Sequence, residues 1–577
     1  MAKSPPKMDK FAIAAALQEI AALMELKGGT YKFKARAYNA GARSIAGVSA
    51  DLGDLVAEDR LTTLPGIGNA LASQIKQLYL TGESSVLKAL REEFPPGIIE
   101  LSTVPGLSVA KIKQLHEGLG IKSAEELKNA AAAGKIRKLK GFGEKTESKL
   151  LESLISHATR SRKPKRLHLH RAWRTAEQIE SYLSTARGLK KLSVAGSLRR
   201  WDETVGTIRF VASTNQPAAL VQHFLRFPLI IQTESQSENR ATVGFADGSR
   251  VSLIAVPPDE FAATLFAETG SSAHVSRIAK LLSQRTPKTR RNVPADLNGD
   301  SEVYHRLGIQ YIPPELRENN GEIEAALKNK LPADLIELED IRGMVHCHTT
   351  YSDGKHSVEE MALAAEAMGM QYITITDHSP TAFYAGGVEF DRLQRQWEEI
   401  DQVQEKVKVK ILRGTESDIL ANGALDYPDK VLEKFDVIVA SIHSRYKMDS
   451  EKMTRRVVAA MQQPVFKIWG HAQGRLIQSR PPFDCDMLRI LDVIAESNAA
   501  VEINGDPYRL DMEPRWVREA RKRKIKFTIS VDAHSTGALH NLKYGVAMAR
   551  RGWVRKGEVL NALPLAQFKK AVTPVVN

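Results

Sequence analysis

The stretch VHCHTTYSDG, residues 345–354, decides the fold predicted for the C-terminal part of this 577-residue chain. Alternate residues of a strand point to the same face, so His346 and His348 converge while Cys347 points away. Asp353 follows in the loop. Imidazole pairs of this kind bind Zn²⁺, Mn²⁺ or Fe²⁺. The stretch therefore predicts a strand that delivers metal ligands to one edge of a sheet.

Segments of the same form recur downstream, each an apolar stretch that ends in metal-binding residues. They are QYITITDH (371–378), VKILRGTES (409–417), FDVIVASIHS (435–444), VFKIWGH (465–471) and KFTISVDAHS (526–535). Helical stretches separate them, which predicts βα units and a mainly parallel sheet. In barrel-like α/β enzymes the strand ends deliver catalytic groups to one rim.

Nine residues in these segments form the predicted ligand set of a multi-metal site, and six of them belong to the chain's 15 histidines. They are His346, His348, Asp353, His378, Glu416, His443, His471, Asp532 and His534. A single His–x–His pair could be a hydrogen-bonded pair in a core. Nine such residues at successive strand ends favour a metal centre instead, with hydrolase chemistry at phosphate esters.

The amino-acid composition indicates which binding partners and which cellular compartment to expect. The chain has 82 basic and 68 acidic residues, a net charge of +14, which favours a polyanion such as nucleic acid but also fits a soluble basic protein. Cys347 and Cys485 are too few for a disulfide framework, so we expect a reducing compartment and a cytoplasmic location. The first 20 residues lack the apolar core of a signal peptide, and no segment is expected to span a membrane.

The first 160 residues show helical spacing interrupted by three glycine hairpins, LPGIG (64–68), VPGLS (104–108) and KGFGE (140–144). Each would turn its backbone N–H groups outward at the start of a helix, where a phosphate can bind without sequence readout. One hairpin alone would fit a purely structural turn, but three resemble helix-hairpin-helix DNA-binding motifs. The expected DNA contacts are Gly66, Gly68, Gly106, Gly141, Gly143 and Lys145.

The middle third carries strands at LKKLSVAGSL (189–198), TIRFVAS (207–213) and RATVGFADGSRVSLIAV (240–256). The turn made by Gly196, Ser197, Arg199 and Arg200 resembles the one that holds the triphosphate in the palm of family X DNA polymerases. That family places three magnesium-binding aspartates on the following strands. Thr207, Arg209 and Ser252 stand at those positions here.

Loss of these carboxylates predicts loss of polymerase activity. Two-metal phosphoryl transfer needs anionic oxygen ligands, which serine and threonine hydroxyls do not replace, and Arg209 adds a positive charge. Asp202, Glu203 and Asp247 lie nearby in turns, off the strand positions, so we do not expect them to substitute.

The order of parts resembles bacterial family X DNA polymerases with a C-terminal PHP (polymerase and histidinol phosphatase) domain. The resemblance implies a multidomain fold: helical helix-hairpin-helix domains, an α+β nucleotidyltransferase-like palm and thumb, and a distorted, TIM-like α/β barrel. The expected domains are a lyase-like domain (1–85), a helix-hairpin-helix fingers domain (86–160), a degenerate palm (166–257), a thumb-like domain (258–335) and the PHP domain (340–577).

The PHP resemblance implies three divalent cations, with Mn²⁺ or Zn²⁺ favoured by the imidazole content. In the family's pattern His346, His348, Glu416 and Asp532 hold one ion, Glu416, His443 and His471 a second, and Asp353, His378 and His534 a third. Arg475 is a candidate clamp for a phosphate oxygen, with a loop salt bridge as the alternative. Asp377 is a candidate to orient a ligand histidine, and Asn504 and Arg509 are candidates to line the pocket.

The resulting functional prediction is a metal-dependent 3′→5′ exonuclease that also cleaves at blocked 3′ ends and abasic sites in base excision repair. A monomer acting on gapped, nicked or 3′-ended DNA is expected, with the polymerase part as an inactive DNA-binding platform. Three alternatives stay open. They are an active gap-filling polymerase with exonuclease activity, a non-catalytic DNA-binding scaffold, and a small-molecule phosphatase, which would leave the three hairpins without a use.

Overall fold

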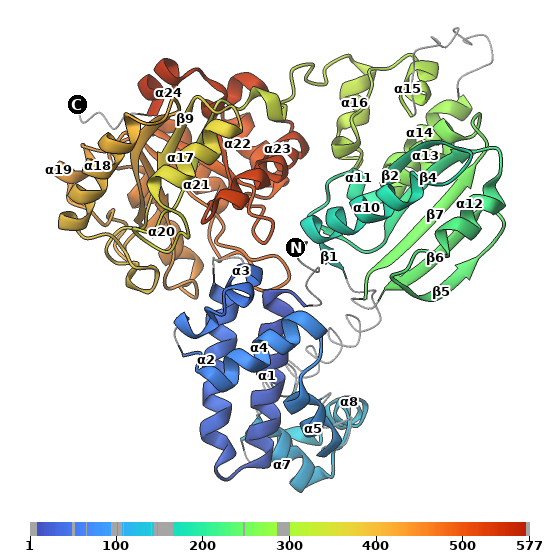
Figure 1. Ribbon diagram of the computed structural model, residues 1–577, viewed down its shortest axis with the longest axis horizontal. Coiled ribbons are helices and arrows are strands. Elements are labelled where there is room, and N and C mark those ends of the chain that lie inside the picture. The colour runs from blue at the N-terminus through green and yellow to red at the C-terminus, as the bar shows by residue number, and fades with distance from the viewer. Residues whose placement is uncertain are drawn as a thin grey trace. The chain divides into compact units, whose positions relative to one another are not determined.

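A computed structural model describes residues 8–48, 52–64, 66–93, 101, 107, 109–139, 141–143, 147, 166–245, 248–284 and 300–572. The chain divides into two compact units, residues 1–165 and 166–577 (Figure 1). Each unit has its own hydrophobic core, and they are described separately below. In the part of the chain that the structure describes, no helix is both long and apolar enough to cross a membrane.

The first unit is helical, as its spacing of apolar residues predicts. Its described α-helices are α1 (Lys10–Lys27), α2 (Tyr31–Gly47), α3 (Leu52–Ala57), α4 (Asn69–Thr81), α5 (Ser85–Glu93), α7 (Val109–Leu119) and α8 (Ala124–Ala132). Two short 3₁₀ turns, η1 (Leu61–Thr63) and η2 (Ile136–Lys138), precede the first and third glycine hairpins.

The first and third hairpins share one backbone pattern. After η1, Leu64 and Ile67 close successive turns, and after η2, Leu139 and Phe142 do the same. Gly66 and Gly141 have φ values of 77° and 90°, a left-handed conformation that favours glycine. The second hairpin, including Gly106, and Lys145 of the third lie outside the described residues.

The second unit opens with the region expected to form the palm. Its elements are β1 (Leu167–His168), α10 (Leu169–Leu183), β2 (Leu189–Ala195), α11 (Gly196–Arg199), β3 (Thr204–Val205), β4 (Ile208–Thr214), α12 (Pro217–Phe224), β5 (Ile230–Gln236), β6 (Arg240–Phe245) and β7 (Arg250–Val256). Five strands form a mixed sheet in the order β2-β4-β7-β6-β5, and β1 pairs with β3. The sequence did not indicate β5, whose residues after Ile230 are mostly polar and exposed.

Four described helices follow the palm: α13 (Phe261–Thr269), α14 (Ser272–Gln284), α15 (Ser301–Leu307) and α16 (Glu322–Leu327). They enclose a small core of their own around Tyr304 and Ile312. The first two, α13 and α14, meet at Gly270 and Ser271. The basic segment 285–299 lies outside the described residues.

The C-terminal part is a nearly closed barrel of seven parallel strands, in the order β14-β13-β12-β11-β10-β9-β8. The strands are β8 (Gly343–Cys347), β9 (Tyr372–Ile375), β10 (Lys410–Asp418), β11 (Val437–Ser441), β12 (Lys467–Trp469), β13 (Ala499–Asn504) and β14 (Phe527–Ser530). The helices between and after them are α17 (Val358–Ala367), α18 (Phe390–Gln404), α19 (Asp429–Leu432), α20 (Ser450–Met461), α21 (Met487–Glu496), α22 (Pro514–Lys522), α23 (Leu542–Arg551) and α24 (Leu565–Val572).

One end of the barrel is plugged with apolar side chains. A cluster that includes Val345, Leu412 and Ile468 from the strands packs against Phe568 of α24. The rings of Tyr372 and Phe568 stack with centroids 4.6 Å apart. Because this end is filled, the strands present their polar residues at the opposite, carboxyl-terminal rim, as the alternation of the sequence predicts.

Candidate metal centre

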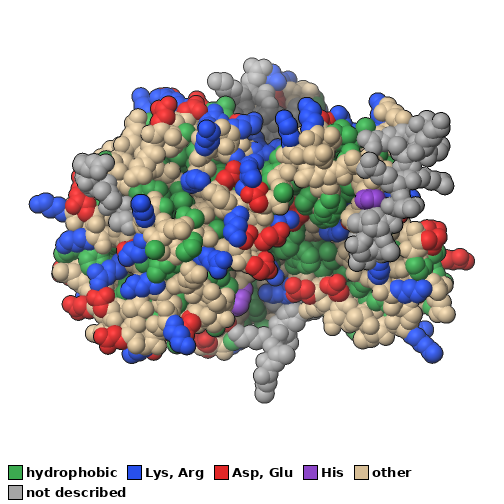
Figure 2. All heavy atoms as spheres, turned by 90° about the horizontal axis from the view of Figure 1, so that it is seen from above, with side chains coloured by type: hydrophobic (Ala, Val, Ile, Leu, Met, Phe, Trp, Pro, Cys, Tyr) green, Lys and Arg blue, Asp and Glu red, His purple; other side chains and the backbone are tan. Residues whose placement is uncertain are grey.

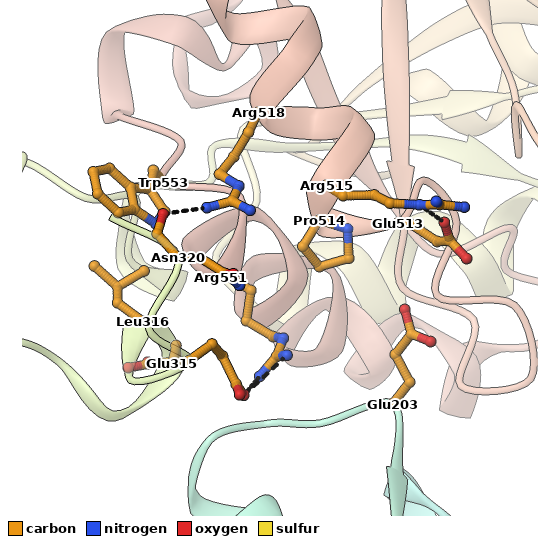
Figure 3. A pocket seen from close by; sticks show the side chains of 11 residues that line it. Glu203, Glu315, Leu316, Asn320, Glu513, Pro514, Arg515, Arg518, Arg551 and Trp553 are labelled. Atoms are coloured by element: carbon orange, nitrogen blue, oxygen red, sulfur yellow. Dashed lines mark hydrogen bonds and ion pairs between the residues drawn. The ribbon is translucent and has the colours of Figure 1, made fainter. Parts of the chain in front are cut away.

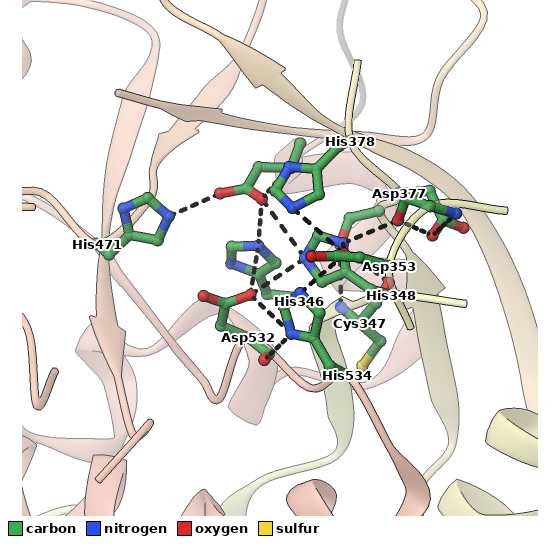
Figure 4. A network of polar contacts seen from close by, with 12 residues as sticks. His346, Cys347, His348, Asp353, Asp377, His378, His471, Asp532 and His534 are labelled. Carbon is green, nitrogen blue, oxygen red and sulfur yellow. Dashed lines mark hydrogen bonds and ion pairs between the residues drawn. The ribbon is translucent and has the colours of Figure 1, made fainter. Parts of the chain in front are cut away.

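All nine predicted ligands lie at the carboxyl-terminal rim of the barrel. His346 is within β8, and Glu416 is near the end of β10. The loops that follow β8, β9, β11, β12 and β14 supply the others, which Figure 4 shows converging in part. Closure of the barrel brings the first and last segments together, since Ala533 exchanges backbone hydrogen bonds with His346 and His348.

The ligand atoms fall into three groups, in each of which all the atoms lie within 4.8 Å of one another. The groups are His346, His348, Glu416 and Asp532; His348, Asp353, His378 and His534; and His378, Glu416 and His443. The first group is the set that the resemblance implies for the first ion. The second group is the set implied for the third ion, with His348 added. The third contains His378 where His471 was expected.

His471 joins the centre through Glu416. Its Nε2 lies 2.8 Å from Glu416 Oε1, and it is almost completely buried. The backbone of His471 and of Asp532 has positive φ, 25° and 51°. Such conformations are strained for residues with a Cβ and cluster at functional sites. The turns after β12 and β14 thus contain a backbone conformation that is uncommon for residues with a Cβ.

Buried polar atoms without hydrogen-bond partners mark the space that ions would fill. They include Nε2 of His346, His348 and His534, Nδ1 of His378, and one carboxylate oxygen each of Glu416 and Asp532. Buried polar atoms are rarely left unpaired. Imidazole nitrogens and carboxylate oxygens of this kind are donors for divalent transition metals, so the residues fit the cations that the fold implies.

The electrostatics of the centre point the same way. Burial opposes ionisation of Glu416, but the neighbouring imidazoles of His443, His346 and His378 outweigh it and hold its pKa well below the ordinary value. Burial and the adjacent rings of His534 and His378 lower the pKa of His348 to about 4. Glu416 thus presents an ionised carboxylate and His348 a neutral imidazole, the forms that bind metal. At His346, His443 and His534 burial is outweighed by the neighbouring carboxylates, which raise the pKa of each imidazole, so a bound cation would displace their protons.

Two carboxylates that the sequence analysis did not single out orient ligand histidines. Glu502 on β13 lies 2.6 Å from Nδ1 of His346, and Asp418 on β10 lies 2.7 Å from Nδ1 of His443. Both contacts leave the Nε2 of the histidine directed at Glu416, 3.4 Å and 3.3 Å away. Carboxylate–histidine pairs of this kind fix the tautomer and orientation of a metal ligand.

Asp377 has a different role from the one considered for it. Its carboxylate accepts hydrogen bonds from the backbone N–H and hydroxyl of Thr349 and from the amide of Gln396. A short contact with the Ser352 hydroxyl adds a fourth partner. Asp377 thus holds the loop that carries Asp353, and contacts no ligand imidazole in the described hydrogen bonds.

Arg475 is engaged in ion pairs at the junction of palm and barrel. Its guanidinium lies 2.6 Å from Glu203 of the palm and 3.1 Å from Glu513 of the barrel. This arrangement matches the alternative considered for Arg475, a salt bridge, and leaves its role as a phosphate clamp without support. Arg509 is a partly buried arginine that faces the centre: its Nε lies 3.4 Å from Asp532, and Nε and Nη1 have no hydrogen-bond partner.

The palm positions expected to bind metal come together without carboxylates. Arg209 on β4 lies opposite Ser252 on β7 in the parallel register, and Thr207 immediately precedes β4. Arg209 pairs with Glu268 at 3.3 Å, and Glu268 also pairs with Arg240 at 2.6 Å. The only groups of three or more candidate ligands among the described residues are those of the barrel rim.

The arginines of the triphosphate turn are also occupied. Arg199 makes two hydrogen bonds to Asp300, at 2.5 Å and 3.1 Å. Arg200 pairs with Asp202 and Glu318, at 2.7 Å and 2.8 Å. The turn after β2, which begins with Gly196 and Ser197, is therefore present in the fold, but its cations are neutralised by the protein itself.

A cleft of about 420 Å³ lies beside these contacts (Figure 3). Its walls carry acidic residues and arginines that pair with one another, including Arg515 with Glu513 and Arg551 with Glu318. Because these charges are paired internally, the cleft does not present a binding site of one charge. On the face seen in Figure 2, basic and acidic side chains are likewise interspersed.

Comparisons with known proteins agree with this architecture. A PHP domain matches residues 345–506, a helix-hairpin-helix domain residues 8–84, and a SAM-like helix-hairpin-helix tandem residues 98–154. The DNA polymerase/3′-5′ exonuclease PolX of Bacillus subtilis is 35% identical over 97% of this chain and 98% of its own length. A probable phosphatase of Caldanaerobacter subterraneus is 29% identical over 33% of this chain and 74% of its own length.

These findings define a multidomain protein with helix-hairpin-helix domains and a PHP phosphoesterase domain. The chain belongs to the family of PolX, the family X DNA polymerases with a 3′-5′ exonuclease. The probable phosphatases cover about a third of the chain, whereas the Bacillus subtilis relative covers 97% of it. A metal-dependent phosphoesterase follows for the barrel, and DNA binding for the chain as a whole.

Proposed function

We propose that the chain is a metal-dependent 3′→5′ exonuclease that also acts on 3′ ends and abasic sites of DNA, with a polymerase module that no longer polymerises. The observation that carries the first part is the rim of the barrel. All nine predicted ligands lie there, and the six of their buried polar atoms named above have no hydrogen-bond partner among the described residues. The Bacillus subtilis relative, named as a DNA polymerase/3′-5′ exonuclease, supports the same reaction.

The chain's own residues divide the work of hydrolysis. Bound divalent cations would act as Lewis acids that supply an activated water and neutralise phosphate oxygens. Glu416 and Asp532 bring negative charge to the middle of the centre, and the histidines around them hold its shape. Glu502 and Asp418 keep His346 and His443 in the tautomer whose Nε2 faces inward.

Arg509 is the residue we assign to the scissile phosphate. It is a partly buried cation beside Asp532, and its Nε and Nη1 make no hydrogen bond to the protein. A guanidinium with free N–H groups binds a phosphate oxygen with charge-assisted hydrogen bonds. Cleavage of the bond between phosphorus and the 3′ oxygen releases a nucleoside 5′-monophosphate and leaves a 3′-hydroxyl on the shortened strand.

Three features support an inactive palm. Thr207, Arg209 and Ser252 provide no carboxylate, and Arg209 directs its charge toward Glu268. Two of the acidic residues considered as substitutes are engaged elsewhere, Asp202 with Arg551 at 2.8 Å and Glu203 with Arg475. The third, Asp247, lies outside the described residues. A two-metal site requires several free anionic oxygens close together.

The glycine hairpins are the elements we assign to DNA. Gly68 precedes α4, a helix whose N-terminus has no side-chain cap. Gly66, Gly68, Gly141 and Gly143 are all exposed. Exposed N–H groups at such positions bind backbone phosphates irrespective of sequence, which suits a platform that holds DNA for a nuclease.

The test uses a 5′-labelled primer on a gapped template, with Mn²⁺ and all four deoxynucleoside triphosphates. Wild type is compared with His346→Ala and His534→Ala, whose side chains are ligands of the centre. Stepwise shortening by wild type, abolished in both variants and without any extension, is the expected result. Extension that survives both substitutions would reveal an active polymerase, and absence of any reaction with every divalent ion would favour a DNA-binding scaffold.

A further inference from the structure

Two aromatic side chains stand exposed beside the metal centre. Phe383 and Tyr384, in the 3₁₀ turn η6 (Phe383–Ala385), are 85% and 58% exposed. Their rings contact each other edge to face, with centroids 6.0 Å apart. Single exposed apolar side chains are common on protein surfaces. An adjacent exposed pair in an active-site loop is not explained by packing.

The pair adjoins the ligands themselves. The Tyr384 ring lies 6.5 Å from the ring of His378 and 6.4 Å from the ring of His443. Those two histidines and Glu416 make up one of the three ligand groups. Any phosphodiester that reaches this group therefore brings the nucleoside attached to it next to Tyr384.

The loop that carries the pair is held firmly at its base. Val388 donates a backbone hydrogen bond to the carbonyl of His378 at 2.8 Å, which closes the loop directly on a ligand. Ala382 and Ala385, on either side of the aromatic pair, are buried. Thr381 donates its backbone N–H to Asp426 at 2.7 Å. The loop is thus fixed by buried neighbours and hydrogen bonds, while the side chains of Phe383 and Tyr384 extend from it into solvent.

We propose that Phe383 and Tyr384 form a stacking platform for the unpaired nucleobase of the 3′-terminal nucleotide, whose phosphodiester is hydrolysed at the adjacent centre. The inference rests on the proposed exonuclease function and names its preferred substrate. The nucleobase is the planar, largely apolar part of a nucleotide, and aromatic side chains stack on any of the four bases without reading sequence.

The geometry favours an unpaired end over a paired one. Inside a duplex both faces of a base are covered by its neighbours, so a base can stack on a protein ring only after it leaves the helix. Leaving the helix costs least for a mismatched, damaged or single-stranded nucleotide. The platform would therefore direct hydrolysis to frayed or mismatched 3′ termini, and spare a correctly paired end.

The test uses the full-length chain with Mn²⁺ and 5′-labelled single strands of equal length. One strand ends in an ordinary nucleotide and the other in a 3′-terminal tetrahydrofuran nucleotide, which has the phosphodiester but no base. The double variant Phe383→Ala/Tyr384→Ala is compared with wild type, with Phe383→Tyr, and with Leu488→Ala. Leu488 is an exposed apolar residue of α21 in the same barrel and serves as the matched control.

The expected result is a loss specific to the base. The double variant should cleave the ordinary end about tenfold to a hundredfold more slowly, the range that loss of one stacked base implies. It should cleave the tetrahydrofuran end within about twofold of wild type, because that end has no base to stack. Phe383→Tyr and Leu488→Ala should resemble wild type on both strands.

A binding measurement complements the rates. A strand ending in 2-aminopurine, whose fluorescence falls on stacking, is mixed with the protein in the presence of a chelator. Quenching by wild type that the double variant loses would support the platform. Equal slowing of both strands in the double variant would indicate a structural role of the loop, and unchanged rates would leave the pair without this function. Absence of cleavage by wild type would instead contradict the exonuclease itself.

Discussion

Glu502 accepts a hydrogen bond from Nδ1 of His346 at 2.6 Å, deep in the barrel and out of contact with solvent. The same carboxylate accepts hydrogen bonds from the hydroxyl of Ser530 and from the backbone N–H of His471, both at 2.5 Å. Glu502 of β13 therefore connects β8, β14 and the loop after β12, and its effect on the metal centre can be measured without changing any ligand.

Substitution of Glu502 should weaken metal binding. Glu502→Gln keeps the shape of the side chain but removes the charge that favours the inward-facing Nε2 of His346. Loss of such a partner typically costs tenfold to a hundredfold in metal affinity. Titration with Mn²⁺ followed by metal analysis should show this shift, and excess Mn²⁺ should restore activity. Glu496→Gln, at an exposed position of α21, should match wild type.

The two arginines near the rim should behave differently on substitution. Arg509→Ala should reduce kcat by about a hundredfold, the loss typical of one phosphate-stabilising donor, with little effect on thermal unfolding. Arg475→Ala should instead lower the unfolding temperature, because it removes the ion pairs through which Arg475 joins Glu203 to Glu513. Equal effects of both variants on kcat, with unchanged stability, would contradict the assignment.

Asp300 should prove important for the stability of the palm. It lies between Arg199 and the fully buried Arg317, and both guanidiniums hydrogen-bond to it. Removal of one partner of a buried ion pair costs about 3–5 kcal/mol, since the remaining charge is left uncompensated. Asp300→Ala should therefore unfold at clearly lower urea concentration than wild type. Asp259→Ala, at an exposed position before α13, provides the comparison.

Lys467 gives a prediction for pH. Its side chain is buried in β12, where its ammonium contacts the carbonyl of Gln463, and burial lowers its pKa to about 8. The unfolded chain binds this proton more tightly, so stability is lost as pH falls from about 10.5 through 8. Lys467→Met should be more stable than wild type at pH 7, by on the order of 3 kcal/mol, and the difference should shrink toward pH 10.

The measurement for Lys467 is thermal unfolding of both proteins from pH 7 to pH 10. A difference in unfolding temperature that stays constant over this range would contradict the assigned cause. Lys526→Met is the matched control. Lys526 lies directly before β14, as Lys467 begins β12, but the side chain of Lys526 is exposed.

Much of the fold follows from sequence periodicity alone. The alternation of apolar strand segments with helical stretches after residue 341 predicts the parallel barrel, and the position of His378, His443 and His471 just beyond the strands predicts their common rim. The edge strand β5 was missed because its residues are polar and exposed, which leaves no alternation to detect.

The partners of the ligands were harder to predict. Asp418 follows Glu416 by two residues and so lies on the same face of β10, a signal that was available. Glu502 gave no such signal, because its position opposite His346 depends on closure of the barrel. One ligand group contains His378 where the family's pattern has His471. The sequence could not predict this difference either, since distances across the rim depend on loop conformation.

The contacts between palm and barrel have a consequence for how such a protein can change over generations. Arg475 reaches Glu203, Arg551 reaches Asp202, and the ring of Trp201 meets Tyr544, so residues next to the old triphosphate turn now support the barrel. Deletion of the palm would remove these acidic partners of Arg475 and Arg551 in the barrel. Under the proposed loss of polymerase activity, the palm would thus remain indispensable, and selection would retain it for the barrel that it supports.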